Sequence, residues 1–237
     1  MRVPVTRINN PKRVFASLSL EPERSVILSA FLGTFGPGDG AWTWRAGGAT
    51  NISFVIHLTR SPYSPILFGY GPPAGVENLL AAALPELPER PRLHFPVADR
   101  EAFERVFTLD AASHTVFSLV RGDLAHAGRR VRAARAAEWD RGEAAPVVSL
   151  EFRSAFVDRV AARVAVGSAG SAAARHAALA LGLFDEGVET IGTVARDDDA
   201  AGRALLASLG YVARGHVLIG EGVLRGARAV GESPRAS

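Results

Sequence analysis

The chain of 237 residues is basic, with a formal net charge of +3 and a sequence pI of about 9.9. Because 48% of its residues are hydrophobic, a chain of this length can bury one large core or two smaller ones. The absence of cysteine excludes disulfides, thiolate metal sites and a cysteine nucleophile. No apolar run has the length of a signal-peptide core or of a membrane span, so we expect a cytoplasmic protein without a membrane partner.

The positive charge comes almost entirely from arginine, since Lys12 is the only lysine. The densest basic segment, residues 129–135, is interrupted by alanines and followed by Glu138 and Asp140. This pattern is typical of a solvated helix face and lacks the aromatic residues that accompany basic ones in many nucleic-acid sites. Nucleic-acid binding is therefore the weakest of the three functional hypotheses that the sequence raises.

Strand and helix patterns alternate through the first half of the chain. The apolar run between Pro22 and Phe35 predicts a buried helix that ends at Gly36. Two segments rich in β-branched and aromatic residues, joined by Ala46-Gly47-Gly48, predict a hairpin. The expected elements are helices over residues 22–35, 76–84 and 100–107 and strands over residues 41–45, 51–59, 65–70 and 93–97.

The second half repeats part of this order. Placing Gly71 on Gly170 brings one predicted helix of each half into register, and the strands that follow then agree within about two residues. Duplication of an ancestral unit explains the repeat, and so does the frequent alternation of strands and helices in α/β proteins. The expected elements are strands over residues 115–120, 147–152, 159–166 and 190–194 and helices over residues 129–140, 172–181 and 199–209.

The segment from Arg163 to Ala172 is a predicted strand that passes through small residues directly into a helix. The first N–H groups of a helix have no partner within the helix, and small side chains would let a phosphate approach them. Tight packing between a strand and a helix requires the same small residues. The pattern by itself therefore leaves anion binding and packing as alternatives.

Residues 159–220 resemble the cofactor-binding half of a GNAT-superfamily N-acetyltransferase. In that family a strand leads into a loop of the form Gln/Arg-x-x-Gly-x-Gly/Ala, and a later strand and helix end in Leu-Gly-Phe/Tyr. Gly170 and Ala172 occupy the last two fixed positions of the loop, and Leu209-Gly210-Tyr211 matches the signature. The rest of the chain resembles the family only in the order of its elements.

The resemblance implies an α/β (α+β) fold with a GNAT-like mixed central sheet flanked by helices, formed by two tandem units. The first unit, residues 1–120, would be divergent and without a cofactor loop. The second unit, residues 121–230, would hold the acetyl-CoA site, and residues 231–237 would form a disordered tail.

The implied activity is transfer of an acetyl group from acetyl-CoA to the amine of a small molecule or peptide. The family separates two parallel strands to open a slot for the cofactor, which here would lie between residues 159–166 and 190–194. The implied cofactor-binding residues are Val164, Val166, Gly167, Ser168, Ala169, Gly170, Ser171, Ala172 and Asp199.

Three positions depart from the family pattern. Gly167 replaces the loop's Gln or Arg, and Asp199 replaces an asparagine beside the cofactor. Leu206 replaces the tyrosine that typically protonates the departing thiolate. These departures favour the second hypothesis, a catalytically inactive GNAT-like protein that serves in binding or dimerisation as a homodimer.

Candidates for the general base of an acetyltransferase are Glu151 and Asp158, which precede the predicted cofactor strand. Both also have arginine neighbours in sequence, Arg153 and Arg159, and the sequence favours exposed carboxylates that pair with these arginines. The six histidines show no metal-ligand spacing with acidic residues, and we expect no metal.

Overall fold

The computed structural model describes residues 5–8, 11–36, 42–46, 52–61, 63–123, 146–149, 153–157 and 169–226. These segments form the mixed α/β fold that the sequence predicts, with helices on a mixed sheet. The helices are α1 (Pro11–Leu18), α2 (Pro22–Phe35), α3 (Pro73–Ala83), α4 (Arg100–Val106), α6 (Ala169–Asp185) and α7 (Ala200–Ser208), with 3-10 turns η1 (Leu84–Glu86) and η2 (Val97–Asp99). The strands are β1 (Val5–Ile8), β2 (Trp42–Ala46), β3 (Ser53–Leu58), β4 (Ile66–Tyr70), β5 (Arg92–Pro96), β6 (Phe107–Val120), β7 (Pro146–Ser149), β8 (Ser154–Val157), β9 (Thr190–Arg196) and β10 (Val212–Leu224).

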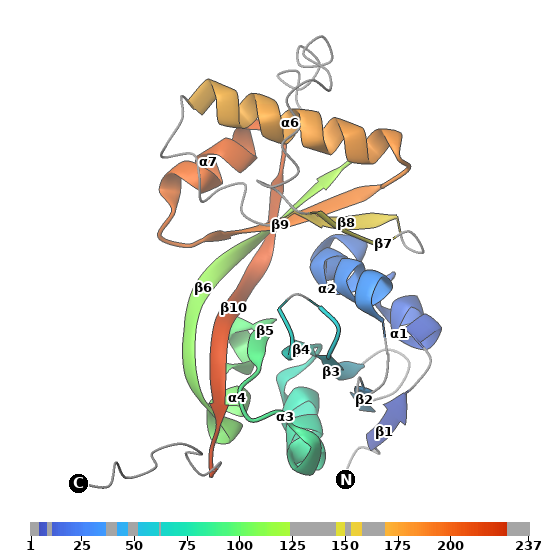
Figure 1. Cartoon of the computed structure of the whole chain (residues 1–237), viewed down its shortest axis with the longest axis vertical. Coiled ribbons are helices and arrows are strands. Elements are labelled where there is room, and N and C mark those ends of the chain that lie inside the picture. The colour runs from blue at the N-terminus through green and yellow to red at the C-terminus, as the bar shows by residue number, and fades with distance from the viewer. Residues whose placement is uncertain are drawn as a thin grey trace, which may run out of the picture.

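The described strands form one sheet in the order β1-β2-β3-β4-β5-β10-β6-β9-β8-β7. Its centre is the long antiparallel pair of β6 and β10, which runs through both halves of the molecule (Figure 1). Most neighbouring strands are antiparallel. The parallel pairs are β4 with β5 and β8 with β9.

The two halves of the chain repeat the same topology around the central pair. In the first half β4, α3, β5, α4 and β6 follow one another, and in the second half β8, α6, β9, α7 and β10 do so. The last strand of each half pairs with the other half, because β6 lies against β9 and β10 lies against β5. The sheet is therefore continuous across residue 120, where the sequence places the border between two units.

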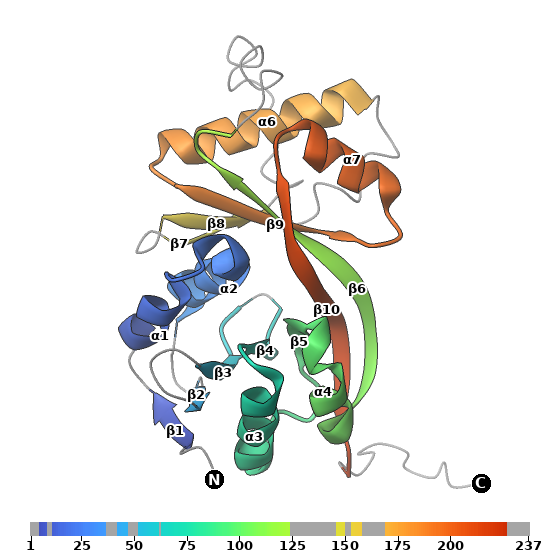
Figure 2. The same cartoon turned by 180° about the vertical axis from the view of Figure 1, so that it is seen from behind.

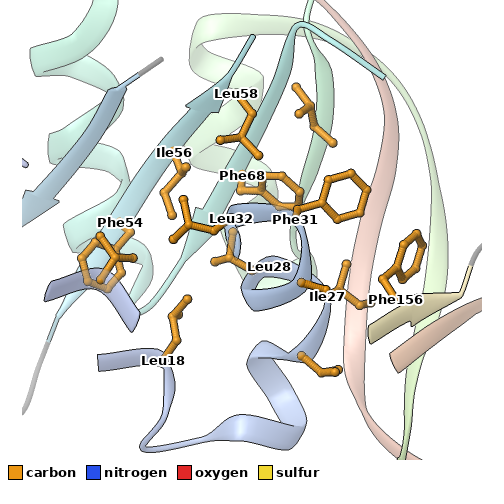
Figure 3. Packing of buried hydrophobic residues seen from close by; sticks show 14 of the residues in the cluster. Leu18, Ile27, Leu28, Phe31, Leu32, Phe54, Ile56, Leu58, Phe68 and Phe156 are labelled. Carbon is orange, nitrogen blue, oxygen red and sulfur yellow. The ribbon is translucent and has the colours of Figure 1, made fainter. Parts of the chain in front are cut away.

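Helix α2 joins the halves by packing on both of them. All of its residues from Ser25 to Leu32 are buried, which agrees with its lack of a polar face. The ring of Phe31 lies 5.4 Å from Phe68 of β4 and 5.3 Å from Phe156 of β8, measured between centroids. Figure 3 shows Leu28, Phe31 and Leu32 facing strands of the first half, with Phe156 entering the same cluster from the second.

Helices α6 and α7 lie on the other side of β9 from α2, as both views show (Figure 1, Figure 2). Gly192 of β9 lets α2 come close to the sheet. A Cβ atom at this position would lie 2.4 Å from Cγ1 of Val26, closer than non-bonded carbon atoms approach. The glycine is therefore a packing requirement of the contact between α2 and the second half.

Most predicted elements are confirmed within one or two residues, including the helix at Pro22–Phe35 and the hairpin of β2 and β3. Strand β6 begins at Phe107, eight residues before the predicted strand at 115–120, and the predicted strand at 147–152 corresponds to the shorter β7. Strand β10 was not predicted. The predicted helix at 129–140, the strand at 159–166 and the tail at 231–237 lie outside the described residues.

Candidate functional site

The structure describes only part of the site that the sequence predicts. Ala169, Gly170, Ser171 and Ala172 form the first turn of α6. The candidate residues Glu151, Asp158, Val164, Val166, Gly167 and Ser168 lie outside the described residues.

Asp199 has a structural role that its sequence position did not reveal. It is the N-cap residue of α7, and its Oδ1 accepts a hydrogen bond from the backbone N–H of Gly202 at 2.8 Å. Such a cap satisfies one of the free amide groups at the start of a helix. The cap accounts for an acidic residue at this position without any contact to a cofactor.

A gap between β4 and β5 forms the candidate site of the first half. These parallel strands pair from Ile66 with Arg92 to Phe68 with His94, where the pairing ends, and Gly69 still lies against Phe95. A cavity of about 540 Å³ lies at this end of the two strands. Its lining comes from the ends of β4 and β5, the start of α3, β3, helix α2 with the turn before it, and residues 214–217 near the start of β10.

The edge of β4 that faces the gap is suited to an extended ligand. On its other edge, β4 remains paired with β3 through Gly69 and Tyr70. Beyond Phe68, β5 does not pair with those two residues. Because Gly69 still lies against Phe95, only the end of β4 at Tyr70 is open on this side to an extended, amide-containing chain.

The start of α3, at one end of the cavity, is a poor anion site. Pro72 and Pro73 have no N–H group, and the N–H groups of Gly75 and Val76 donate to the carbonyl oxygen of Pro72 at 3.0 and 3.2 Å. Few backbone N–H groups at the start of α3 therefore remain to bind a phosphate. The equivalent start of α6 contains no proline.

The turn between α1 and α2 brings a carboxylate to the mouth of the cavity. Oε2 of Glu21 accepts a hydrogen bond from the hydroxyl of Tyr70 at 3.2 Å and forms an ion pair with Arg24 at 3.3 Å. Burial, together with the negative charge of Glu21, raises the pKa of Tyr70 to about 12. The phenol therefore stays protonated and acts as a hydrogen-bond donor at neutral pH.

A second ion pair lies deeper in the same region. Arg214 pairs with Glu23 of α2, and its Nε donates to Oγ of Ser118 at 2.8 Å. Arg214 stands at an irregularity of β10, where the register with β6 shifts between Ala213 and Gly215. The two arginines and two glutamates leave this part of the cavity without net charge.

His94 occupies the point at which the pairing of β4 and β5 ends, and it lines the cavity. Its ring lies 5.1 Å from that of Phe68, measured between centroids. Burial, with a smaller effect from His114, lowers the pKa of His94 to about 3. The imidazole is therefore neutral at pH 7.

A polar cluster around Asp197 reaches the cavity through His216, which lines it. Asp197 accepts hydrogen bonds from Ser113 at 2.5 Å and Thr115 at 2.7 Å, and lies 3.3 Å from Nδ1 of His216. Strand alternation places Thr115 on the opposite face of the sheet from the cavity-lining Val116. We assign this cluster to fixing the turn between β9 and α7.

His176 of α6 is also structural. It is almost fully buried, and its Nε2 lies 2.6 Å from the hydroxyl of Tyr211. Burial lowers the pKa of His176 to about 4, so its ring is neutral. From the sequence alone, the place of His176 near the start of a predicted helix suits either contact with phosphate groups or a partly exposed helix surface. Its burial and its contact with Tyr211 replace both interpretations.

Asp99 is a buried carboxyl group that the sequence did not single out. It precedes α4 as Asp199 precedes α7, but neither of its oxygens has a hydrogen-bond partner among the described residues. Burial raises the pKa of Asp99 to about 7. The capping bond of Asp199 thus has no counterpart in the first half.

The sequence also missed Glu21, Tyr70 and His94 as site residues. The alignment of Gly71 with Gly170 could have pointed to Tyr70, since it places Tyr70 opposite Ala169 of the predicted cofactor loop. Within the described segments no group of three His, Asp or Glu residues could hold a metal ion. No helix in those segments is long and apolar enough to span a membrane.

Comparisons with known proteins return one kind of similarity. No protein-family model matches the chain, and no curated protein matches it. A solved structure is similar to it. That structure is described as the crystal structure of a GCN5-related N-acetyltransferase from Sphaerobacter thermophilus, with 10% sequence identity, a TM-score of 0.45, and coverage of 93% of this chain and 96% of that one.

Proposed function

We propose that this chain is an acetyl-CoA-dependent N-acetyltransferase of the GNAT kind that acts on an amine. The observation that carries the proposal is the cavity of about 540 Å³ at the ends of β4 and β5, where the pairing of these strands stops after Phe68 and His94. The end of β4 at Tyr70 would hold the pantetheine arm. The turn between α1 and α2 then bounds the space for the amine.

The acceptor amine would approach from the side of Glu21. Glu21 can bind an ammonium group in place of Arg24, its present ion-pair partner. The amine must lose a proton before it attacks, and Glu21 is the carboxylate among the cavity-lining residues. Glu151 and Asp158 remain sequence-based proposals for a base in the second half.

The second half offers a slot of the same topology. Strands β8 and β9 are parallel and α6 connects them, so the first turn of α6 corresponds to the start of α3. We retain Val164, Val166, residues 167–172 and Asp199 as proposed cofactor contacts there. The two halves would then bind one or two molecules of acetyl-CoA.

A catalytically inactive binding protein is the second candidate. Pro72 and Pro73 remove amide donors where the family binds pyrophosphate, which favours this candidate for the first half. Leu206, at the family's tyrosine position, is fully buried and has no hydroxyl group. The same fold without turnover would serve in binding or dimerisation.

Calorimetric titration with acetyl-CoA and desulfo-CoA separates these possibilities. Ala98→Trp should fill the cavity of the first half, because Ala98 lines it, and Gly170→Glu should repel a phosphate at the start of α6. Ala82→Trp, on the exposed face of α3, is the control for a surface tryptophan.

Binding that is lost only in Ala98→Trp supports the gap between β4 and β5 as the cofactor site. Binding lost only in Gly170→Glu moves the cofactor to the second half. If the wild-type chain binds neither ligand at millimolar concentration, the enzyme proposal fails and the binding protein remains. Release of the CoA thiol with a panel of amines then measures turnover, without background from the protein because the chain has no cysteine.

A further inference from the structure

The cavity at the ends of β4 and β5 combines an apolar floor with charged side chains at its mouth. The floor comes from helix α2 and strands β3, β4, β6 and β10, through Ile27, Leu28, Phe54, Phe68, Val116 and Val217. None of these six residues is more than 9% exposed. The volume of about 540 Å³ is typical of small-molecule sites, so the cavity has room for a small ligand with an apolar part.

The ion pair at the mouth can exchange its partners. Nη1 of Arg24 lies 3.4 and 3.3 Å from the two carboxylate oxygens of Glu21, and the two side chains are 64% and 51% exposed. An ion pair this exposed contributes little to stability. The hydroxyl of Tyr70 also donates to Oε2 of Glu21 at 3.2 Å. This bond keeps the carboxylate at the mouth when Arg24 turns to another anion.

The second arginine of the cavity is less free to change its partner. Arg214 pairs with Glu23, and its Nε donates to Oγ of Ser118 at 2.8 Å. Its side chain is 27% exposed, against 64% for Arg24. Arg24 is therefore the arginine that can bind an anionic group of a ligand without breaking a buried contact.

We propose that this cavity binds an apolar α-amino acid, with its ammonium group on Glu21, its carboxylate on Arg24 and its side chain on the apolar floor. A zwitterion replaces one ion pair by two and leaves the net charge of the site unchanged. A simple amine would leave Arg24 without a partner, and a simple carboxylate would leave Glu21 without one. The inference rests on the proposed function only for the role of the amino group as the acetyl acceptor.

The walls of the cavity agree with such a ligand. Pro72 and Pro73 have no N–H group, so the start of α3 does not favour a ligand with a phosphate. The ring of His94 lies 5.1 Å from that of Phe68 between centroids, and burial lowers its pKa to about 3. The imidazole is thus uncharged at pH 7. This part of the cavity favours a hydrocarbon or aromatic group over a second charged group.

Calorimetric titration of the whole chain with four probes tests the inference in the absence of acetyl-CoA. The probes are L-phenylalanine, phenethylamine, which lacks the carboxylate, 3-phenylpropanoate, which lacks the amine, and glycine, which lacks the apolar side chain. L-phenylalanine should bind most tightly. Loss of any one of the three groups should weaken binding by about tenfold or more, because each contact is either charge-assisted or buries an aromatic ring.

Two variants should change the order of these affinities. Glu21→Gln should weaken binding of L-phenylalanine and phenethylamine but not of 3-phenylpropanoate. Arg24→Gln should weaken binding of L-phenylalanine and 3-phenylpropanoate but not of phenethylamine. A purely structural role of either residue would change all three affinities alike. Arg100→Gln is the matched control, since it breaks an exposed ion pair with Glu104 away from the cavity lining.

A parallel titration with acetyl-CoA distinguishes failure of this inference from failure of the proposed function. If acetyl-CoA binds and L-phenylalanine does not bind at millimolar concentration, or binds no better than glycine, only the amino-acid site is overturned. If L-phenylalanine binds with the expected order and acetyl-CoA does not, the proposed function fails and the amino-acid site stands. The four probes on the wild-type chain decide the matter even where a variant does not fold.

Discussion

The hydroxyl of Tyr70, at the end of β4, donates a hydrogen bond to Oε2 of Glu21, which precedes α2, over 3.2 Å. The bond joins the two sides of the cavity mouth. It links the strand that is proposed to hold the cofactor to the turn that is proposed to face the acceptor. Its contribution to stability can be measured because Phe and Gln are close in shape to Tyr and Glu and remove the donor and the charge.

Tyr70→Phe should lower the free energy of unfolding by about 0.5–1.5 kcal/mol, since a hydrogen bond to a partly exposed carboxylate is lost. Glu21→Gln should cost a similar amount. The double variant should cost less than the sum, as measured by urea denaturation in a double-mutant cycle. Additive costs would show that the two groups do not interact in solution.

Asp99→Asn should change how stability depends on pH. The folded-state pKa of Asp99 is raised from 3.8 to about 7, so the folded state holds a proton that the unfolded state has already released between these values. Stability contributed by this group is therefore complete below about pH 4 and is lost as pH rises to about 7. The loss is on the order of 2–4 kcal/mol.

Denaturant unfolding from about pH 4 to about pH 8 measures this effect as the difference between wild type and Asp99→Asn. The free energy of unfolding of the variant should rise relative to that of the wild type as pH rises, since the variant carries no charge at this position. The lowered pKa of His176 makes stability depend on pH in the opposite direction. This contribution is the same in both proteins and cancels when their free energies of unfolding are subtracted. A difference that is constant with pH would refute an elevated pKa for Asp99.

Gly192→Ala should destabilise the contact between α2 and β9. The added methyl group would lie 2.4 Å from Cγ1 of Val26 in a fully buried region, and overpacking of this kind typically costs about 1–3 kcal/mol. Gly122→Ala is the matched control, because a Cβ atom there meets nothing within 4 Å. Equal thermal stability of the two variants would mean that α2 does not pack as described.

Asp199→Ala should lower stability by about 0.5–2 kcal/mol through loss of the N-cap of α7. Asp199→Asn should retain most of that stability, because the amide oxygen can accept the same bond from Gly202. If Asp199 acts only as a cap, neither variant changes the affinity for acetyl-CoA at a temperature where both are folded. A change in affinity in both variants would instead support the cofactor contact that the sequence predicts.

Several elements followed from local pattern alone. The apolar run of α2, the β-branched and aromatic segments of the β2–β3 hairpin and the spacing of Val76, Leu79 and Leu80 in α3 each act over a few residues, and the structure confirms them. The register of Gly71 on Gly170 likewise anticipated that β5 and β9 occupy equivalent places. Side-chain periodicity determines such elements because it decides which face is buried.

The remaining features depend on contacts between distant segments. Polar residues such as Asp110 and Ser113 give no strand signal, yet β6 extends through them because β10 pairs with this part of the strand. The cavity lies where the pairing of β4 and β5 ends, and it combines Glu21, Tyr70 and His94 from three places in the chain. The sequence by itself determined the fold class and the repeated order of strands and helices. Only the tertiary structure decided which strands pair with the other half and which side chains meet, because these pairings depend on long-range packing that no local pattern encodes.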